Sequence, residues 1–99
     1  MRLTQAEQST IRHAALEIFG PQITVRLFGS RVDDAKRGGD IDLLVEAPAP
    51  VAQKAQKTLR LVAELQLRLG DQPIDVLVVD PDTTMQPVHK VAQQTGVLL

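Results

Sequence analysis

The sequence has no cysteine, tryptophan or tyrosine, and phenylalanine occurs only as Phe19 and Phe28. Without cysteine the chain can form no disulfide, no thiolate nucleophile and no cysteine-ligated zinc site. That usage suits a reducing compartment, so we expect a cytoplasmic protein. Without tyrosine or tryptophan the chain lacks the usual stacking platform for single-stranded nucleic acid.

An excess of charge of either sign is also missing. Eleven Lys and Arg residues stand against twelve Asp and Glu residues, for a net charge of −1. Because nonspecific nucleic-acid binding depends on many phosphate contacts from Lys and Arg, we expect nucleic acid not to be the partner. No apolar run approaches a membrane span and the N-terminus has no leader-like stretch, so we expect no membrane association.

The length of 99 residues leaves room for one domain, residues 1–99. Hydrophobic periodicity predicts helices that alternate with strands, which is typical of an α/β fold with a small mixed β-sheet and helices packed on it. Thr4 and Glu7 have the spacing of a capping box at the start of the first helix. The predicted elements are a helix between Thr4 and Gly20, a strand over 23–28, a short helix and loop between Arg31 and Gly39, a strand over 40–45, a helix over 51–69, a strand over 72–79, and a helix from Thr83 or Thr84 to about Gln94.

The helix over 51–69 shows an apolar stripe at the 3.6-residue period. Leu61 lies off the edge of this stripe and Leu67 lies nearly opposite it, so we expect both leucines at the surface, a faint hint of a partner surface. The stripe itself consists of Val51, Ala55, Val62, Leu65 and Leu69.

The strand over 72–79 is apolar on both faces, which is typical of a strand that is centrally placed or covered on both sides. Asp71, Asp80 and Asp82 stand in turns, where we expect them to be solvated. The apolar tail over 97–99 is expected to add an edge strand or to dock on the core.

Two acidic residues at the start of the strand over 40–45 mark the candidate site. Asp40 and Asp42 are two residues apart, so in a strand they would point to the same side. Carboxylates about 6–7 Å apart repel by about 2–3 kcal/mol at an effective dielectric constant near 20. The arrangement therefore predicts a cation between them, and Mg²⁺ commonly shares carboxylate ligands with substrate phosphates.

The turn before these acids is suited to phosphate. Gly29 permits a close approach of the backbone or a positive φ, and Ser30 could open a short helix whose N–H groups would face an anion. Arg31, directly after them, is a candidate phosphate contact, with a solvated loop residue as the alternative. A phosphate site beside a metal site predicts binding of a nucleoside triphosphate.

Asp75 is a single charge in an otherwise apolar strand. An unpaired buried carboxylate is costly, so Asp75 either lies in solvent at the end of the sheet or faces a cation.

Gly29-Ser30, a spacer and then Asp40-Ile41-Asp42 resemble the signature of the nucleotidyltransferase superfamily related to DNA polymerase β. Within it the chain resembles the minimal nucleotidyltransferase (MNT) group, which is often paired with HEPN proteins in bacterial toxin–antitoxin operons. The spacer between Ser30 and Asp40 has nine residues, one fewer than the form associated with the best-described MNT antitoxins.

The resemblance implies a metal-dependent enzyme. Asp40, Asp42 and Asp75 would hold two Mg²⁺ ions and carry the catalysis. Gly29, Ser30 and Arg31 would bind the phosphates of ATP or another nucleoside triphosphate. The reaction implied is transfer of a nucleoside monophosphate, AMP from ATP, to a hydroxyl on a partner such as a tyrosine of a HEPN protein.

Two alternatives stay open. The domain could be an inactive antitoxin-type binding module that neutralises its partner by contact, and neutralisation would then survive loss of Asp40 and Asp42. Alternatively, the motif is only a solvent-facing turn and strand end, and Asp40→Asn would be neutral or stabilising. Because the chain lacks aromatic residues that would stack on a purine base, we expect a partner to complete the site. Association of the chain with itself, as a homo-oligomer, is a further alternative.

Overall fold

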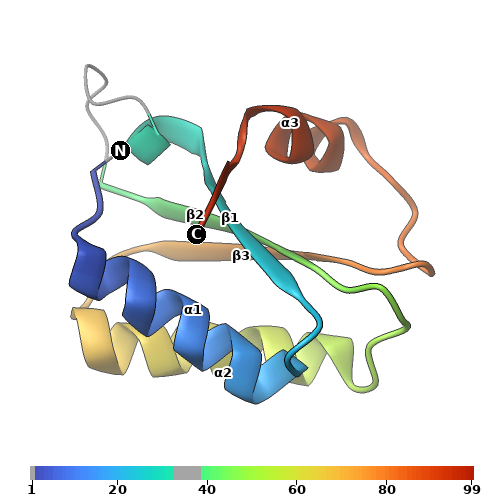
Figure 1. Cartoon of the computed structure of the whole chain (residues 1–99), viewed down its shortest axis with the longest axis horizontal. Helices are drawn as coiled ribbons and strands as arrows, with labels where there is room; N and C mark the ends of the chain where they lie inside the picture. The colour runs from blue at the N-terminus through green and yellow to red at the C-terminus, as the bar shows by residue number, and fades with distance from the viewer. Residues whose placement is uncertain (1, 33–38) are drawn as a thin grey trace.

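The computed structural model describes residues 2–32 and 39–99, and within them helices alternate with strands (Figure 1). This confirms the predicted α/β class. The loop predicted over 33–38, with Lys36 and Arg37, lies outside the described residues. The elements are α1 (Gln5–Phe19), β1 (Thr24–Phe28), the 3₁₀ helix η1 (Gly29–Val32), β2 (Ile41–Glu46), α2 (Lys54–Leu69), β3 (Ile74–Val79), α3 (Pro87–Thr95) and β4 (Val97–Leu98).

The four strands form the predicted mixed sheet, in the order β3-β2-β1-β4. β1 is antiparallel to β2 and to β4, whereas β2 and β3 are parallel. The tail therefore supplies an edge strand, as expected. The prediction of a central or doubly covered third strand is wrong, because β3 lies at the other edge and Leu77 and Val79 on its second face are only partly buried.

Two helices cover one face of this sheet and one helix covers the other (Figure 1). α1 and α2 pack side by side on one face, where Ile11, Leu61 and Leu65 form a core with Leu27 and Leu43 of the strands. α3 lies on the opposite face, over β1 and β2.

The N-terminus of α1 has the capping box predicted from the sequence. The Glu7 backbone N–H donates to the Thr4 hydroxyl at 3.1 Å, and the Thr4 N–H donates to the Glu7 carboxylate at 2.9 Å. These bonds satisfy two donors that the first helical turn would otherwise leave unpaired.

The predicted burial of α2 needs two corrections. Leu61, expected at the surface, is fully buried together with Leu65, and Ala55 of the predicted stripe is exposed, whereas Leu67 is 84% exposed as expected. The assigned stripe was therefore rotated toward Ala55 and away from the buried face. The helix also begins at Lys54 rather than at Val51. Within the described residues no helix is long and apolar enough to cross a membrane.

α3 begins later than predicted, at Pro87 with Gln86 as its N-cap residue. The Thr83 hydroxyl is not available as a cap because it accepts from the Asp80 backbone N–H at 2.9 Å and lies 3.1 Å from the Asp80 carboxylate. Thr83 therefore belongs to the turn after β3.

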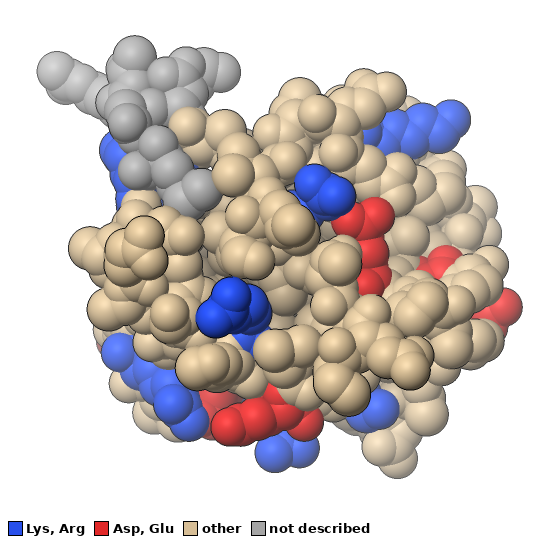
Figure 2. Space-filling model, in the orientation of Figure 1, with Lys and Arg blue, Asp and Glu red and all other residues tan. Residues whose placement is uncertain are grey.

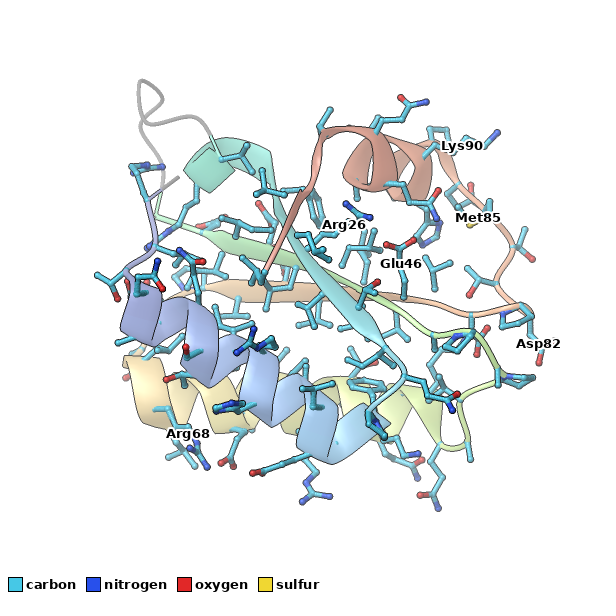
Figure 3. The ribbon with its side chains drawn as sticks, viewed as in Figure 1. Arg26, Glu46, Arg68, Asp82, Met85 and Lys90 are labelled. Carbon is cyan, nitrogen blue, oxygen red and sulfur yellow. The ribbon has the colours of Figure 1, made fainter. Side chains whose placement is uncertain are left out.

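A hydrogen bond to an ion pair between β1 and β2 links α3 to the sheet. Arg26 of β1 and Glu46 of β2 point toward one another beneath the helix (Figure 3), with Nε and Oε1 2.9 Å apart. The Gln93 amide of α3 donates to the other Glu46 oxygen at 3.2 Å. The helix is thus fixed at the far end of β2 from Asp42.

Candidate active site

The register of the sheet places two of the predicted acids side by side. Asp42 pairs with Asp75 in the parallel β2–β3 ladder and with Phe28 in the antiparallel β1–β2 ladder. Directly paired residues point to the same face, and adjacent strands are about 4.8 Å apart. The two carboxylates therefore share the α3 face of the sheet, while Asp40 lies one residue before β2 begins.

The glycine of the motif turn packs directly against one of these acids. Gly29 has a φ of +77°, and a Cβ placed on it would lie 3.1 Å from Asp42 Cγ and 3.4 Å from Asp42 Cβ. A side chain at this position would be strained and would also displace the carboxylate. The Gly-Ser turn and the Asp-x-Asp strand are therefore parts of one structure.

The environment of Asp42 disfavours its charged form. Burial raises the pKa of Asp42 above its ordinary value, and the negative charges of Asp75 and then of Asp40 raise it further. This is the repulsion expected from the sequence, and a divalent cation would offset it.

The donor set fits a hard divalent ion, since all three side chains offer carboxylate oxygens. Asp42 is partly buried, whereas Asp40 and Asp75 are exposed. Within residues 2–32 and 39–99, no group of three or more His, Cys, Asp or Glu side chains is arranged to hold a metal ion. The structure thus brings Asp42 and Asp75 together, with Asp40 close enough to repel Asp42, and three-fold ligation stays a prediction.

Comparison with known protein families identifies the domain. A family model described as nucleotidyltransferase domain matches residues 9–95, most of the chain. The chain belongs to this family. The match spans β1, β2 and β3, which carry or adjoin every predicted site residue, and the size of the chain is consistent with a minimal nucleotidyltransferase domain. No curated protein matches the chain at a significant level.

The guanidinium of Arg31 in the nucleotidyltransferase domain forms hydrogen bonds within the chain. It donates to the Arg2 carbonyl at 3.1 Å, to the Gly39 carbonyl at 2.9 Å and to the Gln72 side-chain oxygen at 2.7 Å. The Ser30 carbonyl in turn accepts a bond from Arg2 at 3.3 Å. A phosphate contact from Arg31 would have to replace some of these bonds, and that contact stays a prediction.

Asp80 is a residue of the nucleotidyltransferase domain that the sequence reasoning placed wrongly. It was expected in solvent, but its side chain is only 2% exposed. A hydrogen bond from Lys54 at 2.8 Å, then one from the Val51 N–H at 2.9 Å, lower the pKa of Asp80 to about 2. The sequence Asp80-Pro81-Asp82 was a signal for this inward orientation. The Asp80 carboxylate accepts a hydrogen bond from the Asp82 N–H and so closes an Asx turn, which holds the side chain against its own backbone.

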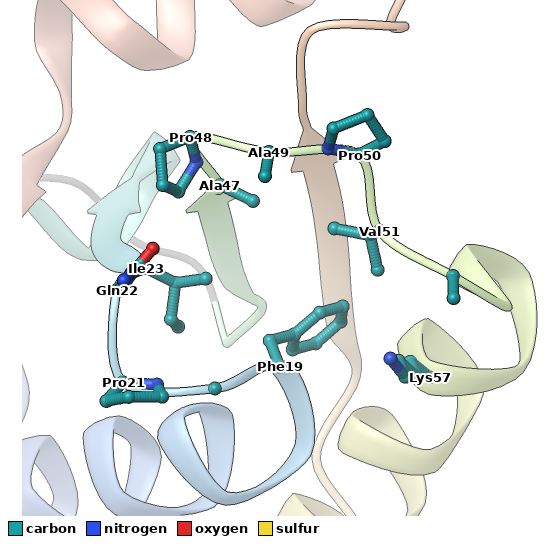
Figure 4. A pocket seen from close by; sticks show the side chains of 12 residues that line it. Phe19, Pro21, Gln22, Ile23, Ala47, Pro48, Ala49, Pro50, Val51 and Lys57 are labelled. Atoms are coloured by element: carbon teal, nitrogen blue, oxygen red, sulfur yellow. The ribbon is translucent and has the colours of Figure 1, made fainter.

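A pocket of about 300 Å³ lies away from the acids (Figure 4). Its lining comes from the end of α1, the approach to β1 and the segment between β2 and α2, and includes Phe19, Pro21, Pro48 and Pro50. Asp42 and Asp75 lie near the beginning of β2 and β3, so this pocket is not the candidate active site of the nucleotidyltransferase domain.

The visible surface of the nucleotidyltransferase domain has Lys and Arg interspersed with Asp and Glu, without a broad patch of one sign (Figure 2). This agrees with the net charge of −1.

Proposed function

We propose that this nucleotidyltransferase domain is a Mg²⁺-dependent enzyme that moves AMP from ATP to a hydroxyl group on a partner protein. The observation that carries the proposal is the packing of Gly29 against Asp42, with Asp75 in register beside Asp42. A turn suited to phosphate beside acids suited to a metal supports nucleotidyl transfer, the reaction that the family's name describes.

The proposed roles follow from the chemistry of each group. Asp40, Asp42 and Asp75 would hold the Mg²⁺ ions, which neutralise triphosphate charge and lower the pKa of the attacking hydroxyl. Gly29 and Ser30 would bind the β- and γ-phosphates through backbone N–H groups and the Ser hydroxyl. Asp75, exposed at the edge strand, would accept the proton of the acceptor hydroxyl.

The reaction is an in-line displacement at the α-phosphorus. A bond forms between the acceptor oxygen and phosphorus, the bond from phosphorus to the bridging oxygen breaks, and pyrophosphate leaves. The charged groups of the site would thus orient the triphosphate and stabilise the charge that develops on it.

The acceptor is proposed to lie on a cytoplasmic partner, a HEPN-type protein encoded nearby. The chain has only Phe19 and Phe28 as aromatic residues; Phe19 lines the distant pocket, and Phe28 pairs with Asp42 in the sheet. With one aromatic side chain beside the acids, a partner would complete the grip on the nucleotide, which supports transfer to that partner rather than to a free small molecule.

The test is incubation of the purified protein with Mg²⁺, ATP labelled on its α-phosphate and the protein encoded next to it. We expect label on the partner from the wild type, a loss of at least about 100-fold with Asp42→Asn, and none of this loss with Asp71→Asn, an exposed acid in the turn before β3. Equal labelling by wild type and Asp42→Asn would contradict the proposal.

A binding module that neutralises its partner by contact is the second candidate. The observation that favours it is the lack, within the described residues, of three acidic or His side chains arranged as metal ligands. An Asp40→Asn/Asp42→Asn double variant separates the two functions. Full neutralisation of the partner by this variant would support the binding module, and lost neutralisation would support the enzyme.

A further inference from the structure

One guanidinium connects the beginnings of the two strands that carry the acids. Arg31 Nη2 donates to the carbonyl of Gly39, the residue before Asp40, and to the side-chain oxygen of Gln72, just before β3. Both bonds lie beyond the first pair of the parallel ladder, Ile41 with Ile74. The bridge therefore holds the strands at the end where the acids lie.

Gln72 is itself held in place by the end of α2. Its side-chain amide donates to the Leu69 carbonyl at 2.8 Å, and its own carbonyl accepts from the Gln66 amide at 3.2 Å. Gln72 thus links Arg31 to a helix that packs on the core, and the bridge has a fixed anchor.

The ends of a β-ladder open more readily than its middle. Here the repelling pair Asp42 and Asp75 is only the second pair from the end, so repulsion between the carboxylates favours opening. A backbone bond from the Ile41 N–H to the Pro73 carbonyl, at 3.0 Å, lies at this end of the ladder. A bridge outside it, carrying a positive charge, opposes the separation.

We propose that Arg31 and Gln72 are positioning residues that set the spacing of the acids on β2 and β3 for metal binding. The inference rests on the proposed function for its metal-binding part. It gives Arg31 a role through the neighbouring strands rather than through a phosphate.

The first measurement is calorimetric titration of the full chain with Mn²⁺ alone. We expect Gln72→Leu and Arg31→Lys to weaken Mn²⁺ affinity about 10-fold, as for partners that orient metal ligands. Gln72→Glu keeps the acceptor for Arg31 but loses the donor to the Leu69 carbonyl, so its Mn²⁺ affinity should lie between those of wild type and Gln72→Leu. Gln56→Leu, a matched change at an exposed position of α2, should leave the affinity unchanged.

The second measurement is amide hydrogen exchange without metal. The Ile41 N–H should exchange at least about 10-fold faster in Gln72→Leu than in wild type, because a bond to a charged group no longer holds the strand ends. The Ala47 N–H, which donates to Val79 at the other end of the same ladder, is the internal control and should not change.

The outcomes separate the two proposals. Unchanged Mn²⁺ affinity and unchanged Ile41 exchange in Gln72→Leu would overturn the positioning role. Loss of ATP affinity in Arg31→Lys, with Gln72→Leu behaving as wild type in both measurements, would also overturn it and return Arg31 to the phosphate. A wild-type protein that binds no Mn²⁺ would contradict the proposed function, and the exchange of Ile41 would still decide whether the bridge holds the strands.

Discussion

Gly29→Ala probes the contact on which the site depends. Gly29 has a φ of +77°, where an L-residue costs about 1–2 kcal/mol, and an alanine Cβ would also meet the Asp42 side chain. The cost of φ is partly offset by about 0.4–1 kcal/mol, because alanine lowers the entropy of the unfolded chain. Moving the Asp42 side chain from its rotamer adds about 0.5–1.5 kcal/mol.

The expected loss in the free energy of unfolding is therefore about 0.5–3 kcal/mol. Gly70→Ala shows the cost of backbone strain without a contact, since nothing lies within 4 Å of the added Cβ. Gly70 has a φ of 91° and a ψ of 176°, where an L-residue costs about 1–3 kcal/mol, so its loss is not subtracted from that of Gly29→Ala. The contact with Asp42 is measured by a double-mutant cycle instead.

Urea unfolding followed by far-ultraviolet circular dichroism is the assay, because the chain has no tryptophan or tyrosine for fluorescence. A double-mutant cycle with Asp42→Ala should show a favourable coupling of about 0.5–1.5 kcal/mol, as the smaller side chain makes room for the new Cβ. Additive losses would refute the packing of the turn against the acid.

Three further predictions concern charge and core. Without metal, Asp42→Asn should raise the free energy of unfolding by about 1 kcal/mol in urea titrations at neutral pH, because it removes the repulsion with Asp75 across the strands; a loss of stability would contradict that reading. Since the pKa of Asp80 falls from 3.8 to about 2, its contribution is present above pH 3.8 and is lost as the pH falls toward about 2. As the pH falls across this range, the melting temperature of the wild type should therefore fall more steeply than that of Asp80→Asn. Equal slopes for the two proteins would contradict a stabilising role of the Asp80 charge. Leu61→Ala should lower the free energy of unfolding in urea by about 2–5 kcal/mol, and Leu67→Ala by less than about 0.5 kcal/mol. Equal losses would contradict the observation that α2 turns Leu61 toward the core and Leu67 toward solvent.

Local signals in the sequence predicted most of the fold. The capping box at Thr4, the Gly20-Pro21 stop and the alternation after Asp40 depend on neighbouring residues, and the structure has each corresponding element. The nucleotidyltransferase family was predicted from the spacing of Gly29-Ser30 and Asp40-Ile41-Asp42, and the family match confirms it.

What the sequence could not predict depends on contacts between distant segments. Burial of Asp80 is favourable only because Lys54 and the Val51 N–H meet it from the start of α2. The Arg31 guanidinium is held by Gly39 and Gln72, a pairing that no spacing indicates. Strand order likewise follows from pairing across the chain, so β3 looked central when it is at an edge.

The hydrogen bond from Gln93 to Glu46 restricts how α3 can lie relative to the candidate active site. Glu46 and Asp42 lie four residues apart on one strand, which fixes them about 13 Å from each other. α3 could close over the acids only by giving up the Gln93 bond, and β4, which follows α3 directly, also holds it by pairing with β1. α3 is therefore held on the side of β1, and a partner that completes the candidate site would meet it from the edge strand β3.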